Sequence, residues 1–547
     1  MKKKIILVML MTLALSAALF GCSGTGAGEE ARMLFLSAEE LLVKGDECSD
    51  NMDYENALKY YEKAWEKENG TAANNIGYMY QLGQGVERDY AKAMEYYEMA
   101  AEMGNATALS NIGYFYDYGY GVEIDYDKAK EYYEKAIEQG SGLAASNLGY
   151  MYECGKGVEQ DYTKAKEYYE KSMELDCGVG AGCLGNLYQY GCGVEPDYEK
   201  AMELYQKAID LGDGYGANRL GNMYQYGEGV EQNYDEALRY YEEGMCLGDD
   251  DAVANLGYMY DYGYGVEQDY EKAMEYYEKA ILLGSGMAAG DLAYMYECGH
   301  GVEQDYEKAL EYYEVGLEMG YGGCGNDLGY LYLYGEGVEQ DYDKAIEYYE
   351  AGLKLGNGNC ANSLGYMYET GEGVSQDYEK AIEYYEIGVQ LESSTAANNL
   401  GYLYENGYGV DQDYAKAKEY YELALEKGSA RAADDLGYLY ASGYGVDQDY
   451  AKAKEYFELS LEMGYGYAAS DLASLYYTGQ GVEKDYGKAV EYWAQAFEIT
   501  ADGYYAYCIA CTYYYDNNDS AAAQEWLQKA VEAGYTEVEE LQTDLGM

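Results

Sequence analysis

Residues 148–169 read LGYMYECGKGVEQDYTKAKEYY, and near-copies of this stretch fill most of the 547-residue chain. Each copy contains Gly-Val-Glu or a close variant, and its glycine recurs every 36 residues. These glycines are Gly85, Gly121, Gly157, Gly193, Gly229, Gly265, Gly301, Gly337, Gly373, Gly409, Gly445 and Gly481. A period of this length without strand-like alternation predicts a helical solenoid, in which each unit packs only against its neighbours.

Each copy predicts two short helices, as the first full copy illustrates. Ile76 and Tyr80 share one face of a first helix, called helix A, which should end at the Gly83-Gln84-Gly85 turn. Asp89 stands at the N-cap position of a second helix, helix B, and Gly104 follows the end of that helix. The repeat is therefore predicted to be an antiparallel helix pair.

Small and aromatic residues occupy fixed positions, or slots, in this pair. Gly77 and Ala93 are predicted to lie where the two helix backbones cross closely, since larger side chains would separate them. Helix B is expected to turn Tyr96 and Tyr97 toward the core. The slots of Tyr78, Tyr80, Tyr90, Tyr96 and Tyr97 together hold 54 of the 78 tyrosines. The high tyrosine content is thus a property of the repeat.

The pattern Leu-Gly-x-x-Tyr-x-x-Gly-x-Gly-Val-x-x-Asp-x-x-Lys-Ala-x-x-Tyr-Tyr resembles the Sel1-like repeat, a relative of the tetratricopeptide repeat. The resemblance covers residues 71–502 in twelve copies. One departure is tyrosine in the slot of Tyr96, where the family often has tryptophan. The resemblance implies a right-handed superhelical solenoid of antiparallel helix pairs that acts as a scaffold for protein assembly, and it implies no catalysis.

The two ends of the array differ from its middle. Residues 30–70 predict a capping helix pair without the Gly-x-Gly-Val turn, and residues 503–547 predict a tetratricopeptide-like capping pair with helices over 504–515 and 521–533. With the twelve central repeats, this gives an all-α solenoid of about fourteen helix pairs.

The N-terminal segment is predicted to be a lipoprotein signal. Residues 1–21 combine three lysines with an apolar run over residues 5–20, as signal peptides do. Leu19-Phe20-Gly21-Cys22 resembles the bacterial lipobox, which implies lipid attachment at Cys22, followed by a flexible tether over residues 22–29. The expected location is the bacterial cell envelope, outside the cytoplasm, with membrane contact through the lipid anchor only. The alternative is ordinary secretion with Cys22 incidental.

Charge and composition exclude several functional classes. The chain has 36 Lys and Arg against 101 Asp and Glu, for a net charge of −65, so nucleic acid is excluded as a partner and basic partners are favoured. A single histidine, His300, excludes His-based triads and His-rich metal sites. An enzyme would need a mechanism built on Asp and Glu alone, and no unique acidic pair stands out. No catalytic residue, cofactor or metal is expected.

A candidate binding surface follows from the helical wheel. Tyr78 points away from the core, and its slot holds tyrosine in nine of twelve repeats, while the slot of Asn75 holds Asn or Asp in nine. The resemblance places helix A on the concave side. The candidate peptide-binding residues are Asn75, Tyr78, Asn111, Tyr114, Asn147, Tyr150, Asn255, Tyr258, Asp291, Tyr294, Asp327, Tyr330, Tyr366, Asn399, Tyr402, Asp435 and Tyr438.

These two ladders suggest a ligand class. Amides can bond to an extended peptide backbone, and exposed tyrosines can stack on prolines, sugars or cationic side chains. We therefore expect a basic protein or peptide partner, with glycan or cell-wall binding as the alternative. A further alternative is that neighbouring repeats bury the Tyr78 slot. The sequence does not specify an oligomeric state.

Eleven cysteines remain besides Cys22, and this odd number does not fit a framework in which all cysteines pair in disulfides. Most are expected to be small buried residues. Cys508 and Cys511 have the CxxC spacing but lie inside a helical pattern, which disfavours a redox role.

Overall fold

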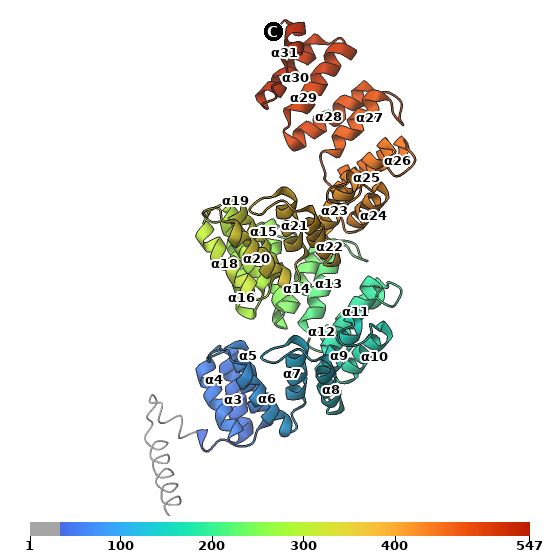
Figure 1. The fold of residues 1–547 in the computed structure, drawn as a ribbon. Helices are drawn as coiled ribbons and strands as arrows, with labels where there is room; N and C mark the ends of the chain where they lie inside the picture. Colours follow the sequence, from blue (N-terminus) through green and yellow to red (C-terminus); the bar gives the residue numbers. More distant parts are fainter. Residues whose placement is uncertain (1–32, 547) are drawn as a thin grey trace, which may run out of the picture. The chain divides into compact units, whose positions relative to one another are not determined.

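The computed structural model describes residues 33–546, and all regular structure in this range is helical (Figure 1). It contains 29 α-helices, α3 to α31, and one π-helical turn, η1 (Thr512–Asp516). The predicted all-α solenoid of fourteen helix pairs is confirmed. The predicted signal segment, Cys22 and the tether lie outside the described residues.

The first helices of the pairs, helices A, are α3 (Ala38–Asp50), α5 (Gly70–Leu82), α7 (Ala106–Tyr118), α9 (Gly142–Cys154), α11 (Gly178–Tyr190), α13 (Gly214–Tyr226), α15 (Asp250–Tyr262), α17 (Gly286–Cys298), α19 (Gly322–Tyr334), α21 (Gly358–Thr370), α23 (Ser394–Asn406), α25 (Ala430–Ser442), α27 (Ala468–Thr478) and α29 (Gly503–Cys511).

The second helices, helices B, are α4 (Tyr54–Trp65), α6 (Tyr90–Glu102), α8 (Tyr126–Glu138), α10 (Tyr162–Glu174), α12 (Tyr198–Asp210), α14 (Tyr234–Cys246), α16 (Tyr270–Leu283), α18 (Tyr306–Glu318), α20 (Tyr342–Lys354), α22 (Tyr378–Gln390), α24 (Tyr414–Glu426), α26 (Tyr450–Glu462), α28 (Tyr486–Thr500) and α30 (Ser520–Glu532). The chain forms two compact units, unit 1 up to Leu283 and unit 2 from Gly284, with seven helix pairs in each.

Caps set the ends of the helices as the sequence predicts. The Asp89 side chain accepts a hydrogen bond from the Lys92 backbone N–H at the start of α6. Gly83, with φ of +76°, ends α5 in the left-handed conformation that glycine adopts most readily. The Asp89 N–H also donates to the Tyr80 carbonyl at 2.9 Å, which closes the loop between the two helices.

The second glycine of each turn explains the invariant tyrosine at the start of helix B. Gly157 has φ of +65°, and a Cβ atom there would lie 2.1 Å from the Cβ of Tyr126 in the preceding repeat. Gly193 and Tyr162 repeat this contact one repeat later. The glycine therefore lets the turn of one repeat pack directly on the preceding helix B.

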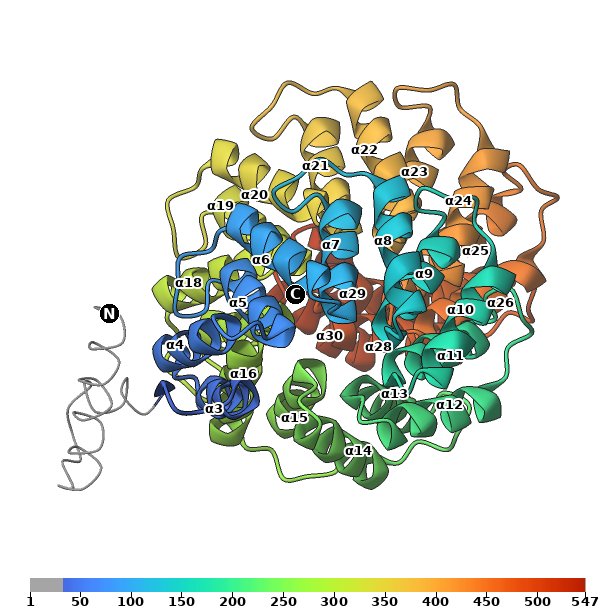
Figure 2. The same cartoon turned by 90° about the horizontal axis from the view of Figure 1, so that it is seen from below.

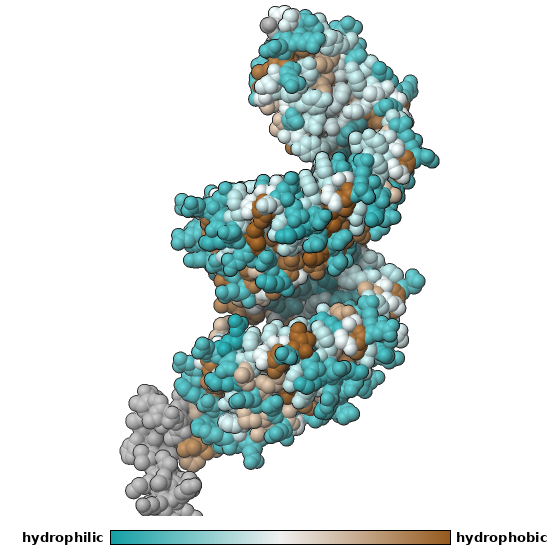
Figure 3. Space-filling model, in the orientation of Figure 1, coloured by the Kyte–Doolittle hydropathy of each residue, from teal (hydrophilic) through white to brown (hydrophobic). Residues whose placement is uncertain are grey.

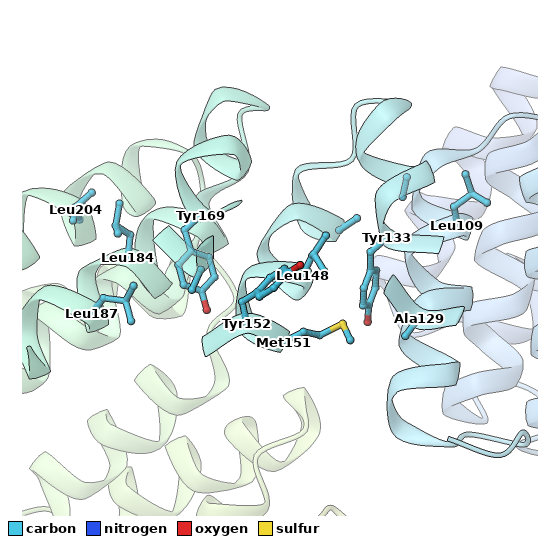
Figure 4. Packing of buried hydrophobic residues seen from close by; sticks show 13 residues of the cluster. Leu109, Ala129, Tyr133, Leu148, Met151, Tyr152, Tyr169, Leu184, Leu187 and Leu204 are labelled. Atoms are coloured by element: carbon cyan, nitrogen blue, oxygen red, sulfur yellow. The ribbon is translucent and has the colours of Figure 1, made fainter. Parts of the chain in front are cut away.

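The tyrosines in the slot of Tyr97 form the centre of each core. Figure 4 shows Tyr133 and Tyr169 on either side of Leu148 and Met151. The Tyr169 ring packs on α9 at Gly149, where a Cβ atom would lie 2.7 Å from the ring. The predicted close helix crossing is confirmed, and the ring of helix B is the group that requires glycine there.

A second set of tyrosines packs the two helices of a pair together near the surface. Tyr80 and Tyr96 stack with ring centroids 5.8 Å apart, and the Lys92 ammonium lies 5.0 Å from the Tyr80 ring. The same stack forms in ten further repeats. Such ring pairs contribute about 0.5–1.5 kcal/mol each beyond burial.

The C-terminal end differs from the prediction in two respects. The helix predicted over residues 504–515 changes to a π-helical turn after Cys511. A further helix, α31 (Glu539–Leu545), follows the last pair, and its Leu541 is buried in a cluster with Ala510 and Leu527. This helix covers apolar surface of the last helix pair.

Candidate partner-binding surface

Helices A line the inner side of each unit. Consecutive helices A contact one another, α7 to α15 in unit 1 and α17 to α23 in unit 2, whereas contacts between consecutive helices B are less extensive. In unit 1, α12 and α14 accordingly lie outside α13 and α15 (Figure 2). We call the surface formed by the slots of Asn75, Tyr78 and Leu82 on helices A the inner face.

The Tyr78 slot is exposed in most repeats. The exposed fraction of its seven most accessible tyrosines runs from 36% at Tyr402 to 48% at Tyr78. The others are Tyr150, Tyr294, Tyr330, Tyr366 and Tyr438. Tyr114 and Tyr258 are half-buried. The alternative that neighbouring repeats bury this slot is therefore wrong for the seven exposed tyrosines.

The two half-buried tyrosines belong to clusters that the sequence analysis missed. The Tyr114 ring lies 4.4 Å from that of Tyr118 and 5.7 Å from that of Tyr120. Tyr258 makes equivalent contacts with Tyr262 and Tyr264 in another repeat. The signal was available, because a residue four positions after Tyr78 lies on the same helical face.

The amide slot makes contacts between neighbouring repeats that the sequence analysis did not predict. Asn111 donates to Asn74 Oδ1 at 2.9 Å, Asn255 to Asn218 at 2.8 Å and Asn399 to Asn362 at 2.9 Å. Each bond joins two neighbouring repeats. Asp435 accepts from Asn398 at 2.9 Å. All members of this slot on the candidate list, which also include Asn75, Asn147, Asp291 and Asp327, are half-buried.

These bonds occupy amide groups that were expected to bond to the backbone of a peptide partner. A helical wheel shows which residues share one face of a helix. It does not show that a side chain 37 residues earlier, on the preceding helix A, lies within hydrogen-bonding distance. In the bonded repeats the amides hold consecutive helices A together.

The helices A of unit 2 are acidic, and four of their acids, Asp291, Asp327, Asp435 and Asp471, lie in the Asn75 slot of the inner face. Helices A from α17 to α27 carry eight acids, Asp291, Glu297, Asp327, Glu369, Glu405, Asp434, Asp435 and Asp471, against one base, Arg431. Burial raises the pKa of Asp327 and of Asp471 to about 6, and it also raises the pKa of Glu297 and Glu405. A cation bound among these carboxyls would offset the cost of their burial.

The family model described as Sel1 repeat matches the chain fourteen times over most of its length. The chain belongs to the Sel1 repeat family. The matched segments are residues 30–69, 70–105, 106–141, 142–177, 184–213, 214–249, 250–285, 286–321, 326–357, 359–392, 394–429, 430–465, 466–498 and 501–535.

Solved structures include further Sel1 repeat proteins. The protective antigen c5321 of uropathogenic Escherichia coli, described as having an SLR fold, is 28% identical, with a TM-score of 0.38, over 88% of this chain and 97% of that one. A Sel1 repeat protein from Oxalobacter formigenes is 30% identical, with a TM-score of 0.35, over 44% of this chain and 98% of that one. Immunity protein Pa5087 from Pseudomonas aeruginosa is 30% identical, with a TM-score of 0.29, over 35% and 74%. No curated protein matches the chain.

Sel1 repeat proteins generally act as scaffolds for protein–protein interaction and are generally not enzymes. In this Sel1 repeat protein, residues 33–546 bring together no group of three His, Cys, Asp or Glu side chains that could hold a metal ion. Nor does any helix in that range have both the length and the apolar character to cross a membrane.

The cysteines of this Sel1 repeat protein are mostly not buried. Only Cys324 and Cys360 are buried among the eleven free cysteines of the described residues, so the expectation of mostly buried cysteines is wrong. Cys154 and Cys298 end a helix A in the exposed slot of Leu82. Burial raises the pKa of the Cys508 thiol to about 11, which opposes the thiolate that CxxC redox chemistry requires.

Proposed function

We propose that this protein is a lipid-anchored scaffold of the bacterial cell envelope and that its inner face binds basic protein or peptide partners. The observation that carries the proposal is the combination of exposed tyrosines with eight acids and one base along α17 to α27. Tyrosine faces attract ammonium and guanidinium groups, and carboxylates pair with the same groups.

The outer surface provides contrast. The face of the molecule drawn in Figure 3 is mainly hydrophilic, with hydrophobic residues scattered between. Helix B carboxylates are often paired within their own helix, as in the 2.6 Å ion pair of Lys135 with Glu131. Exposed pairs of this kind contribute about 0.3–0.5 kcal/mol and leave a solvated surface rather than a docking site.

A selection experiment tests the binding proposal. Random dodecapeptides displayed on phage would be selected on the chain without residues 1–22, at low salt. We expect enrichment of peptides rich in Arg and Lys whose capture falls steeply as salt rises, because screening weakens attraction between exposed charges. Enrichment of neutral or acidic peptides would contradict the proposal. Salt-independent retention of purified wall polysaccharide, with no peptide enriched, would favour the glycan alternative.

The anchor is tested separately. Expression of the full chain in Escherichia coli with a labelled fatty acid should give a labelled envelope protein, and Cys22→Ser should abolish the label. Labelling that survives in the Cys22→Ser variant, or no labelling of the unaltered chain, would contradict lipid attachment at Cys22.

A further inference from the structure

One stretch of the inner face departs from the repeat and contains a hollow. It lies in unit 2 between α17 and α19, has a volume of about 280 Å³ and is lined by Gly290, Asp291, Tyr294, Glu297, Tyr313, Tyr321, Asn326, Asp327 and Tyr330. Three of these residues are acids and four are tyrosines. The volume is too small for a drug-sized ligand and fits a single side chain.

Gly290, which lines the hollow, interrupts the amide ladder. The same slot holds asparagine in five other repeats, and four of these amides accept a bond from the residue 37 positions later, as Asn74 does from Asn111 at 2.9 Å. At Gly290 there is no such side chain to fill the space beside Asp327. A Cβ atom there would lie 3.1 Å from Cys324 Sγ and 3.5 Å from the Tyr321 ring.

Unit 1 contains the equivalent position with a cation already in place. Three repeats earlier, Gly182 interrupts the ladder in the same way, and Arg219 occupies the slot of Asp327. The Arg219 guanidinium lies 5.6 Å from the Tyr190 ring and 5.9 Å from the Tyr215 ring, donates to the Tyr190 hydroxyl, and approaches Gln189 Oε1 at 3.4 Å. A guanidinium among tyrosines is therefore a group that this part of the repeat accommodates.

The residues around Asp327 suit a cation that comes from outside. Asp327 stands at the position that Arg219 holds three repeats earlier, and Glu297 stands at the position of Gln189. Two positions that hold a cation and a neutral amide in unit 1 therefore hold acids in unit 2. Glu297 accepts a hydrogen bond from the Tyr313 hydroxyl at 2.7 Å, which fixes its carboxylate at the hollow. The flat guanidinium, with five donors and an affinity for aromatic faces, matches such a site better than a compact ammonium.

We propose that the hollow between α17 and α19 binds the guanidinium group of an arginine side chain from a basic partner segment. This inference rests on the proposed function and identifies one residue type that the partner must present. Carboxylates of the hollow accept N–H bonds from the guanidinium, and the tyrosines enclose it. The rest of the inner face then binds the flanking chain.

Saturation-transfer NMR with a defined peptide tests the assignment. The probe is acetyl-Gly-Ser-Arg-Ser-Gly-amide, titrated into the full chain purified in detergent, with citrulline and lysine versions as comparisons. Citrulline keeps the shape of arginine but not its charge. We expect the arginine peptide to bind at least tenfold more tightly than either. Equal or tighter binding of the citrulline or lysine peptide would overturn the assignment.

Variants of the hollow use residues that the repeat already tolerates. Asp327→Asn introduces the residue found at Asn75, Asn111 and Asn147, so the fold should be kept, and it should weaken the arginine peptide at least tenfold. Asp327→Arg should abolish binding, because it restores the arrangement of Arg219. Glu318→Gln removes one charge from the exposed end of α18 and should leave affinity unchanged. Unchanged affinity in both Asp327 variants would overturn the inference.

The two proposals fail in different ways. If basic dodecapeptides are selected on the chain but neither Asp327 variant changes the affinity of the arginine pentapeptide, the hollow is not an arginine site and the proposed function stands. If no basic peptide is selected, the proposed function fails.

Discussion

Single residues decide whether a slot of the repeat serves packing or stays open to a partner. An asparagine in the slot of Asn74 holds consecutive helices A together, and glycine in the same slot lines a hollow at Gly290. Asp434, which lies in the same slot, is a third case. Its Oδ1 is buried and has no hydrogen-bond partner among the described residues. Burial, with Asp471 and Asp435 nearby, raises the pKa of Asp434 to about 8.

Asp434→Asn is expected to stabilise the protein in a pH-dependent way. The pKa of Asp434 is higher folded than the value of about 3.9 expected unfolded, so its ionisation costs stability increasingly as pH rises from about 4 to about 8. Asparagine removes this cost and should raise the free energy of unfolding by about 2 kcal/mol at pH 8.5, and by less at pH 4.5. Urea denaturation at both values measures the difference.

The exposed Asp447 provides the control, since Asp447→Asn should change stability by less than about 0.5 kcal/mol at either pH. A gain for Asp434→Asn that is equal at pH 4.5 and pH 8.5 would show that ionisation of the buried carboxyl is not its cause.

At the scale of elements, the turn between helices A and B is the least tolerant part of the repeat. Its second glycine combines a positive φ with direct contact to the preceding repeat, as at Gly157 against Tyr126. Gly140, after helix α8, has a positive φ of +89°, but a Cβ atom added there would meet nothing within 4 Å. Alanine substitutions at these two glycines therefore separate the cost of a left-handed backbone from the cost of a packing clash.

Gly157→Ala should destabilise the array more than Gly140→Ala. The left-handed conformation costs an alanine about 1–2 kcal/mol at either position, and the clash with Tyr126 should add about 1–3 kcal/mol at Gly157 only. Hydrogen exchange of α8, α9 and α10 measures the local effect. Equal protection in the two variants would contradict the packing role of this glycine.

The sequence specifies these elements well because each repeat carries its own start and stop signals. Asp89 and Gly83 predict helix ends correctly, and the slot of Tyr97 predicts the core contacts correctly. Helix α31 and the π-helical turn lie outside the periodic pattern, so no repeated signal marks them. The bonds of Asn111 and the hollow beside Asp327 depend on residues from two repeats, and a helical wheel of one helix cannot show them.

For the whole molecule, a net charge of −65 opposes the compact state. Ion pairs within helices B, such as those of Lys418 with Glu422 and Lys454 with Glu458, offset only part of this repulsion. This net charge should therefore make the stability of the array sensitive to ionic strength.

Thermal stability should rise with salt. Between 20 and 300 mM NaCl the screening length falls from about 20 Å to about 6 Å, which weakens repulsion between neighbouring repeats. We expect the unfolding temperature, followed by circular dichroism, to rise equally in NaCl and in choline chloride. A rise in NaCl alone would indicate a sodium site instead of screening, and a fall would contradict the role of repulsion.

The proposed function places partner binding on the exposed tyrosines of the inner face. Tyr366, Tyr402 and Tyr438 lie in consecutive repeats of unit 2, outside the hollow, and can be changed together to alanine. Ile387 and Leu459, exposed apolar residues of helices B, give a matched variant when changed to alanine.

The most direct measurement is the dissociation constant of one selected basic dodecapeptide for the unaltered chain and for these two variants. We expect the tyrosine variant to bind at least tenfold more weakly with an unchanged unfolding temperature, and the helix B variant to bind as the unaltered chain does. Equal binding by the tyrosine variant, or a loss of binding in the helix B variant, would contradict it.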